Sequence, residues 1–237
     1  MILVGSGALV WRAAAHAADA GVDVDLVLHP QGEEVPAFAA GIDHLATVDV
    51  NLLADVIDEA STDGIICSTG NPFLFRAPVL EMGLTIVNVH GAPLPGYRGL
   101  PVVAGAFALL RGETVFGATL HRVDAGIDTG AVIDRHTFPL RDEVTLEELT
   151  LTVTEACHAL FVDNLSDLGR EPADAVSSRS GEYFGRARLP ELAAQADHPR
   201  YARATHLGVM AEFYPEEARV FSAARLSYRP SFSSSAS

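Results

Sequence analysis

Two polar side chains, Asn88 and His90, stand one residue apart near the middle of the chain. They close an apolar run, residues 84–90, that has the pattern of a buried strand. Side chains alternate between the two faces of a strand, so both polar groups share one side while Val89 takes the other. An amide N–H and a protonated imidazole placed together could stabilise an oxyanion that develops during a reaction.

A stiff loop follows this pair. Residues 91–99 contain two prolines and three glycines, which excludes a helix and predicts a loop that wraps over the strand ends. Farther along, His121 ends a second strand-like run, and Asp128 lies in a glycine-bearing loop, residues 124–130. From that loop the Asp128 carboxylate could reach His90 or an ordered water molecule.

Each of these side chains also has a purely structural interpretation. Asn88 and His90 could satisfy a nearby turn, and Asp128 could form a turn beside glycine. His121 could equally be a hydrogen-bonded histidine of the core. His90, His121 and Asp128 could also form a metal site with two histidines and one carboxylate.

Two further features permit chemistry but favour a structural role. Gly5-Ser6-Gly7 opens an alanine-rich segment, where main-chain N–H groups could receive a phosphate, but a tight turn capped by Ser6 is the favoured interpretation. Cys67 ends a strand-like run, and burial as a small apolar residue is favoured over a role as nucleophile.

Strand-like and helical runs alternate along the chain. Strand-like patterns occupy 2–4, 22–28, 64–68, 84–90, 115–123 and 131–140, and helical patterns occupy 8–20, 51–60, 72–82, 101–111 and 145–168. This alternation predicts an α/β fold, a mostly parallel sheet with helices on both faces. In such sheets ligands bind beyond the carboxyl ends of the strands, which is where the polar residues described above lie.

Composition and charge exclude several functions. The formal net charge of −15 argues against a nucleic-acid partner, and the absence of lysine excludes Schiff-base chemistry and a phosphate-loop lysine. Two cysteines are too few for a disulfide framework, and no apolar stretch approaches the ~20 residues that cross a bilayer. We therefore expect a soluble, cytoplasmic protein with no membrane partner.

The chain changes in character near residue 176. Patterned α/β sequence over 1–176 predicts the main domain, and weak periodicity over 177–237 predicts a small, partly irregular C-terminal extension. The serine-rich end, residues 231–237, is expected to be disordered. The extension could mediate pairing into a homodimer or close over a substrate.

Two long motifs resemble the signatures of the folate-dependent formyltransferases, the family of the glycinamide ribonucleotide, methionyl-tRNA and amino-sugar N-formyltransferases. The first is Asn-Val-His-Gly-Ala-Pro-Leu-Pro-Gly-Tyr-Arg-Gly at 88–99, and the second is Gly-Ala-Thr-Leu-His-Arg-Val-Asp-Ala-Gly-Ile-Asp-Thr-Gly at 117–130. Their order and spacing agree with the family, and the resemblance covers about residues 62–165. It implies a Rossmann-like formyltransferase fold and an enzyme that uses 10-formyltetrahydrofolate as formyl donor.

The resemblance also implies roles for individual residues. Asn88, His90 and Asp128 would be the catalytic residues, with Asn88 and His90 stabilising the oxyanion and Asp128 positioning His90 or a water and relaying a proton. The pterin of the folate would rest against the main chain around Asn71, Phe73, Leu74, Val123, Ala125 and Ile127. The candidate substrate-binding residues are Tyr97, Arg98 and His121.

One departure bears on the acceptor. Ala92 stands where the family commonly has serine, so a substrate or loop contact of that hydroxyl is missing. The short extension and the negative charge argue against a tRNA acceptor and favour a small-molecule amine, such as an amino sugar, an amino acid derivative or a hydroxylamine. No metal is expected. Two alternatives stay open: a 10-formyltetrahydrofolate hydrolase, and a non-catalytic module of the same fold that binds folate or a nucleotide.

Overall fold

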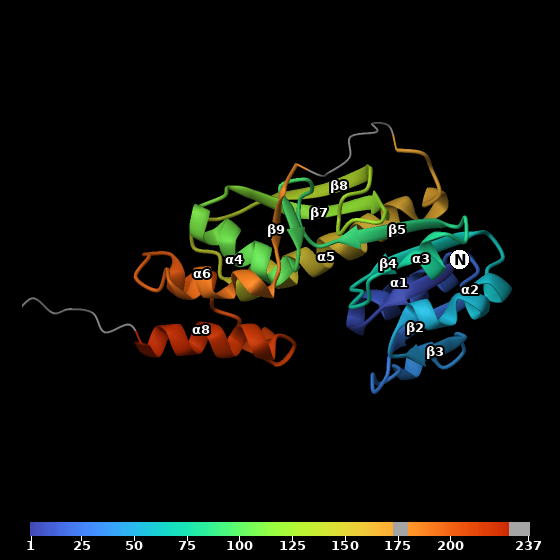
Figure 1. Ribbon diagram of the computed structural model, residues 1–237, viewed down its shortest axis with the longest axis horizontal. Coiled ribbons are helices and arrows are strands. Elements are labelled where there is room, and N and C mark those ends of the chain that lie inside the picture. Colours follow the sequence, from blue (N-terminus) through green and yellow to red (C-terminus); the bar gives the residue numbers. More distant parts are fainter. Residues whose placement is uncertain (173–179, 228–237) are drawn as a thin grey trace, which may run out of the picture.

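The computed structural model describes residues 1–172 and 180–227. Its main feature is a seven-stranded sheet with the order β3-β2-β1-β4-β5-β7-β8 (Figure 1). Five strands run parallel: β1 (Ile2–Gly5), β2 (Leu26–Pro30), β3 (His44–Thr47), β4 (Ile65–Thr69) and β5 (Thr85–His90). The last two, β7 (Val115–Arg122) and β8 (Val132–Pro139), are antiparallel to their neighbours. The predicted mostly parallel α/β sheet is thus confirmed.

Alternating strand residues build a core on each face of the sheet. Leu3, Cys67 and Val87 face one core, which also receives α1 (Gly7–Asp19), α4 (Pro101–Arg111) and α5 (Leu146–Asn164). Ile2, Ile66 and Ile86 face the other core, which is closed by α2 (Ala54–Ala60) and α3 (Ala77–Leu80). Because both faces are covered, the strand ends are left as the place where polar side chains and ligands can meet.

Two local predictions differ from the structure. The helix predicted over 72–82 is wrong except for α3, because the preceding backbone is bonded by side chains instead of by a helix: the Asn51 amide donates to the Leu74 carbonyl and accepts from the Arg76 N–H. The edge strand β3 was not predicted, since three of its four side chains are exposed and carry no apolar alternation.

The C-terminal segment is more regular than its sequence pattern indicates. It contains β9 (Glu182–Phe184), α6 (Leu189–Ala193), α7 (Tyr201–Ala204) and α8 (Pro215–Ser227), and β9 pairs in parallel with β6 (Tyr97–Gly99) as a second, two-stranded sheet. Helices α6 and α8 lie at the end of the molecule opposite β2 and β3 (Figure 1).

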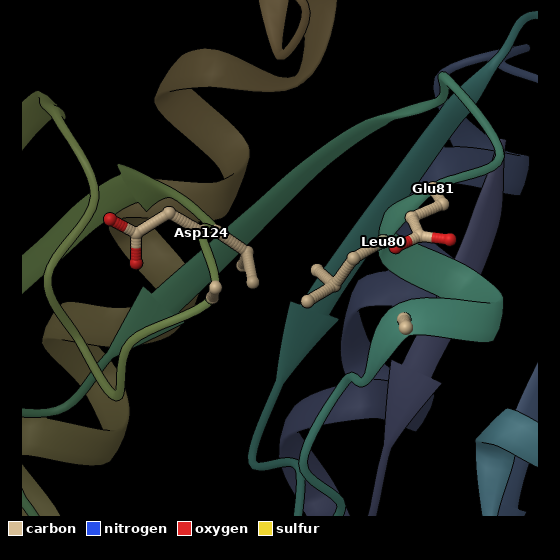
Figure 2. A pocket seen from close by; sticks show the side chains of 6 residues that line it. Leu80, Glu81 and Asp124 are labelled. Carbon is tan, nitrogen blue, oxygen red and sulfur yellow. The ribbon is translucent and has the colours of Figure 1, made fainter.

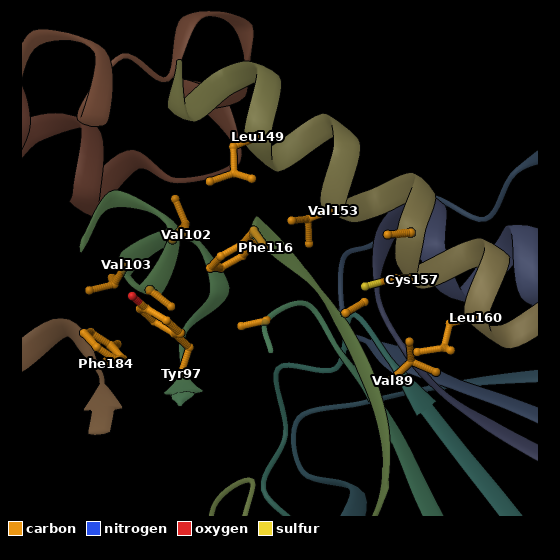
Figure 3. Packing of buried hydrophobic residues seen from close by; sticks show 14 of the residues in the cluster. Val89, Tyr97, Val102, Val103, Phe116, Leu149, Val153, Cys157, Leu160 and Phe184 are labelled. Atoms are coloured by element: carbon orange, nitrogen blue, oxygen red, sulfur yellow. The ribbon is translucent and has the colours of Figure 1, made fainter. Parts of the chain in front are cut away.

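This segment shares the main core. Phe184 and Leu192 are fully buried in the same cluster as α4 and α5, and Figure 3 shows Phe184 beside Tyr97 and Val103. The predicted boundary at residue 176 and the predicted disordered tail, 231–237, lie outside the described residues. Within the described residues, no helix is long and apolar enough to cross a membrane.

Candidate active site

The strand β5 brings Asn88 and His90 to the carboxyl edge of the sheet, where β7 places His121 directly opposite Asn88. The Asn88 Nδ2 atom lies 3.1 Å from His121 Nε2, and His121 Nδ1 lies 2.7 Å from the Arg122 carbonyl oxygen. A carbonyl can only accept, so we assign the ring proton to Nδ1, and Nε2 accepts from the Asn88 amide.

The environment of His121 favours this neutral form. The ring is 2% exposed. Burial, followed by the charge of neighbouring His90, lowers the pKa of His121 to about 4, against a smaller opposing effect of the Asp128 carboxylate. His121 is therefore uncharged at neutral pH and orients the Asn88 amide with its nitrogen toward the ring. Both ring nitrogens of His121 are bonded within the protein, to Asn88 and to the Arg122 carbonyl, and not directed at a substrate as its predicted role requires.

His90 is held by the loop that follows β5. Its Nε2 atom lies 3.0 Å from the Tyr97 carbonyl oxygen, so that nitrogen donates, and its Nδ1 atom lies 3.6 Å from Asp128 Oδ1. The Asp128 carboxylate is thus close enough to stabilise a positive charge on the His90 ring, although 3.6 Å is longer than a hydrogen bond.

Asp128 adopts an unusual backbone conformation that aims its carboxylate at both histidines. Its φ angle is 52°, in the left-handed region that aspartate tolerates better than most residues. The Oδ2 atom accepts a hydrogen bond of 2.8 Å from the Gly99 N–H, and Oδ1 lies 3.7 Å from His121 Nε2. The structure therefore brings the three predicted catalytic residues together, with His121 as a fourth member.

Sequence reasoning missed the main-chain partners of this cluster. The Tyr97 carbonyl and the Gly99 N–H carry no residue-type signal, so only their place in the motif loop could have indicated them. Thr119, also missed, is fully buried on β7 and donates to the Ala92 carbonyl while accepting from the Leu94 N–H. The Ala92 methyl is itself fully buried, so a side chain at this position contacts packed neighbours instead of a substrate.

A cleft of about 360 Å³ lies between α3 and the loop after β7, the loop that also carries Asp128 (Figure 2). It is lined by Ala77, Leu80, Glu81, Val123, Asp124 and Ala125. Figure 2 shows Leu80 directed across the gap, whereas the carboxylate of Asp124 is turned away from it. That carboxylate accepts hydrogen bonds from the Gly126 N–H and the Thr129 hydroxyl, so the facing walls of the cleft are largely apolar.

Only part of the predicted folate-binding set lines this cleft. Val123 and Ala125 do, and the Val123 N–H is fixed by a hydrogen bond to the Ile86 carbonyl. Asn71 instead accepts from the Phe73 N–H, and the Phe73 ring packs against the second core. Leu74 and Ile127 are exposed. The α3 residues of the cleft are not among the predicted folate-binding residues.

Two candidate substrate-binding residues have their side chains engaged elsewhere. The Tyr97 ring is buried and stacks on Phe184 with 5.0 Å between centroids, and its hydroxyl donates to Glu113. The Arg98 guanidinium donates two hydrogen bonds to the Gly181 carbonyl. The structure gives no support to substrate contacts by either side chain.

The N-terminus of α1 already holds a carboxylate. Glu33 Oε1 accepts from the Gly7 N–H and from Trp11 Nε1, each at 2.8 Å. The predicted cap by Ser6 is wrong, because the Ser6 hydroxyl donates to the Gly70 carbonyl. With Glu33 in this position, the helix end is occupied by the protein's own anion.

Within the part of the chain that the structure describes, neither a cysteine nor a cluster of metal ligands adds to the site. Cys67 is fully buried, and burial raises the pKa of its thiol to about 12, which suits a packing role. Among residues 1–172 and 180–227, no group of three or more His, Cys, Asp or Glu side chains is arranged to hold a metal ion.

Comparison with known proteins identifies the family to which this chain is similar. The family model described as formyl transferase matches residues 42–165. A methionyl-tRNA formyltransferase of Deinococcus radiodurans is 34% identical over 126 residues, which are 53% of this chain and 38% of that protein. The chain therefore spans well under half of that relative's length.

Solved structures share the fold. A glycinamide ribonucleotide transformylase 1 from Symbiobacterium toebii superposes with a TM-score of 0.58 at 26% identity, covering 68% of this chain and 83% of that one. A sugar N-formyltransferase from Shewanella sp. FDAARGOS_354 gives a TM-score of 0.69 at 19% identity, covering 87% and 88%. An N-formyltransferase from Helicobacter canadensis, solved with folinic acid and dTDP-3-aminofucose, gives a TM-score of 0.62 at 20% identity. The match covers 78% of this chain and 70% of that one.

Proposed function

This chain belongs to the formyl transferase family, and on that premise we propose that it transfers a formyl group from 10-formyltetrahydrofolate to the amine of a small molecule. The observation that carries the proposal is the cluster of Asn88, His90, Asp128 and His121 at the carboxyl edge of the sheet. The loop that carries Asp128 also lines an apolar cleft. Such a cluster supplies hydrogen-bond donors and a proton-holding group without a nucleophilic side chain.

Asn88 and His90 act on the carbonyl oxygen of the formyl group. Negative charge develops on that oxygen when an amine attacks, and donors already in place stabilise it without reorganisation. One N–H of the Asn88 amide is held by neutral His121, which fixes the direction of the second N–H toward a ligand. The Nδ1–H of a protonated His90 provides the second donor, because Nε2 is already bonded to the Tyr97 carbonyl and Asp128 Oδ1 lies beyond hydrogen-bond distance. The nearby Asp128 carboxylate stabilises the positive charge of the ring.

Asp128 also handles the proton that the amine loses. Its side chain is 12% exposed and sits between the two histidine rings, so it can pass a proton to a neighbouring group or to water. Because the Gly99 N–H holds Oδ2, the Oδ1 atom is the one directed at the rings. The amine nitrogen forms a bond to the formyl carbon, the bond from that carbon to N10 of the folate breaks, and the proton lost by the amine is passed on to N10 as tetrahydrofolate leaves. Transfer is then direct, with no covalent enzyme intermediate.

The cleft between Leu80 and Val123 suits the flat pterin of a folate. Its apolar walls can cover both faces of an aromatic ring, and main-chain groups of residues 123–125 can bond the ring edge. The folate, when bound, supplies the formyl group. Folinic acid in the Helicobacter canadensis structure supports a folate ligand for this fold.

A small amine is the favoured acceptor. The names of two relatives give different acceptors, methionyl-tRNA and glycinamide ribonucleotide. The Helicobacter canadensis structure contains a nucleotide-linked amino sugar. The net charge of −15 disfavours a tRNA, and Glu33 leaves no vacant anion site at the N-terminus of α1. An amino sugar, an amino acid derivative or a hydroxylamine fits these constraints.

Release of tetrahydrofolate from 10-formyltetrahydrofolate tests the proposal. A transferase releases it quickly with the right amine and is nearly idle without one. Release that does not depend on any amine would instead identify a hydrolase, and folate binding without release would identify a binding module. If Asn88→Ala and His90→Ala left the rate unchanged, the assigned mechanism would be wrong.

A further inference from the structure

A short strand outside the family match lies against the loop of the candidate active site. The match ends at residue 165, whereas β9 begins at Glu182. β9 pairs in parallel with β6, with Tyr97 opposite Glu182 and Gly99 opposite Phe184. Figure 1 shows β9, in orange, beside the green part of the chain that carries β6.

Several contacts fix β9 to this loop. The Leu100 N–H donates to the Phe184 carbonyl at 2.9 Å, and the Arg98 guanidinium donates to the Gly181 carbonyl at 2.8 and 3.2 Å. The Phe184 ring anchors the strand: it is fully buried, stacks on Tyr97, and lies 5.2 Å from the Phe107 ring. Phe184 is therefore the residue of β9 that attaches this strand to the main core.

The backbone between β9 and Asp128 has little freedom. Gly99 has a φ of 98°, and a Cβ at this position would lie 2.9 Å from the Phe184 carbonyl oxygen. The Leu100 N–H donates to the carbonyl of Phe184 on β9. The preceding N–H, that of Gly99, donates to Asp128 Oδ2, so two consecutive main-chain donors link β9 to the candidate site.

We propose that β9, anchored by Phe184, is a positioning element of the active site: it fixes the Gly99 N–H, which in turn holds the Asp128 carboxylate between His90 and His121. Phe184 touches no reacting atom and acts only through Gly99 and Asp128. The catalytic consequence rests on the proposed function, but the structural link between β9 and Asp128 does not.

Amide hydrogen exchange at Gly99 tests that link without any assay of activity. In protein labelled with ¹⁵N-glycine, the Gly99 amide of the wild type should exchange slowly. Phe184→Ala should accelerate its exchange at least ~10-fold, and Asp128→Ala should do the same by removing the acceptor. Leu192→Ala is the matched control, since Leu192 is equally buried in the same segment but lies on α6, outside the β6–β9 pair.

Kinetics then test the catalytic consequence. Phe184→Ala should lower kcat by ~10- to 100-fold while KM for 10-formyltetrahydrofolate changes less than about twofold, because orientation and not folate binding is lost. Leu192→Ala should leave kcat unchanged even if it lowers the melting temperature as much as Phe184→Ala does. Phe184→Leu replaces Phe184→Ala if the latter does not fold.

The outcomes separate the two proposals. Unchanged Gly99 exchange in the Phe184 variant, or an equal loss of kcat in both variants, overturns the positioning role. If the wild type formylates no amine, the proposed function fails, while accelerated Gly99 exchange in the Phe184 variant still supports the link from β9 to Asp128.

Discussion

Asn88 and His121 share a hydrogen bond, with 3.1 Å between Nδ2 and Nε2, that fixes the state of both side chains. The imidazole accepts because its other nitrogen donates to the Arg122 carbonyl, and the amide must therefore present its nitrogen. A protonated His121 would have no lone pair to offer, so the donor direction of Asn88 depends on a histidine that stays neutral.

The stability of the fold should depend on pH through His121. Its pKa is about 4 in the folded protein and near 6.5 in an unfolded chain, so between these values the unfolded chain binds more protons. The free energy of unfolding should therefore be intact above about pH 6.5 and fall as the pH drops toward 4, by on the order of 3 kcal/mol. Urea denaturation between pH 4 and 7.5 measures how the free energy of unfolding changes with pH.

His121→Gln is the control for this titration. Glutamine can still accept from Asn88 but does not titrate, and the carboxylates that also respond to acid are present in both proteins. The difference between the two pH profiles should thus isolate His121. Parallel profiles from pH 4 to 6.5 would contradict the assignment of a buried, neutral ring.

Asn88→Ala should lower kcat by about 10² to 10³, as loss of one oxyanion donor does in other acyl-transfer sites. The effect should fall on kcat more than on KM for the folate, since the amide acts on charge that develops during the reaction. Steady-state kinetics with the identified amine measure both. Asn164→Ala, a buried asparagine at the end of α5, should leave kcat near that of the wild type.

The central strands β1, β2, β4 and β5 were predictable because they are largely buried apolar runs. The end of α4 was predictable from Arg111-Gly112, where glycine takes a φ of 73°. The predictions that failed concern elements that depend on tertiary contacts. Asn51 forms hydrogen bonds with the backbone of residues 74 and 76, and a local sequence pattern gives no sign of an asparagine more than twenty residues away. In the C-terminal segment, α6 and α7 span only five and four residues, which is too few to show a helical periodicity.

The three residues proposed to be catalytic were predicted from motif resemblance, and the structure brings them together at the ends of β5 and β7 and in the loop after β7. The groups that hold these side chains in position were not predictable. The groups that hold His90 and Asp128 are a carbonyl and an N–H of the main chain, which any residue carries. The cap of α1 was mispredicted because Glu33 reaches it through tertiary structure, whereas Ser6 stands next to the helix in sequence.

Leu80→Asp should weaken folate binding at least ~10-fold, because a carboxylate placed on an apolar wall must lose water when the pterin enters. Titration with a stable formyl folate, followed by calorimetry, gives the dissociation constant directly. Leu151→Asp is the matched control, since that leucine is 48% exposed on α5 and lies outside the cleft. Equal affinities in the two variants would place the folate elsewhere.

Glu33→Ala should destabilise the fold by about 1–2 kcal/mol, since a carboxylate at a helix N-terminus interacts favourably with the helix dipole and its removal leaves two donors without their acceptor. Those donors are the Gly7 N–H and the indole of Trp11, the single tryptophan of the chain. Urea unfolding followed by Trp11 fluorescence measures the loss. Glu33→Gln, which keeps an acceptor oxygen but no charge, should lie between the wild type and the alanine variant. The exposed neighbour provides the control: Glu34→Ala makes the same change in net charge, so a loss as large as that of Glu33→Ala would show that charge, and not the cap, is responsible.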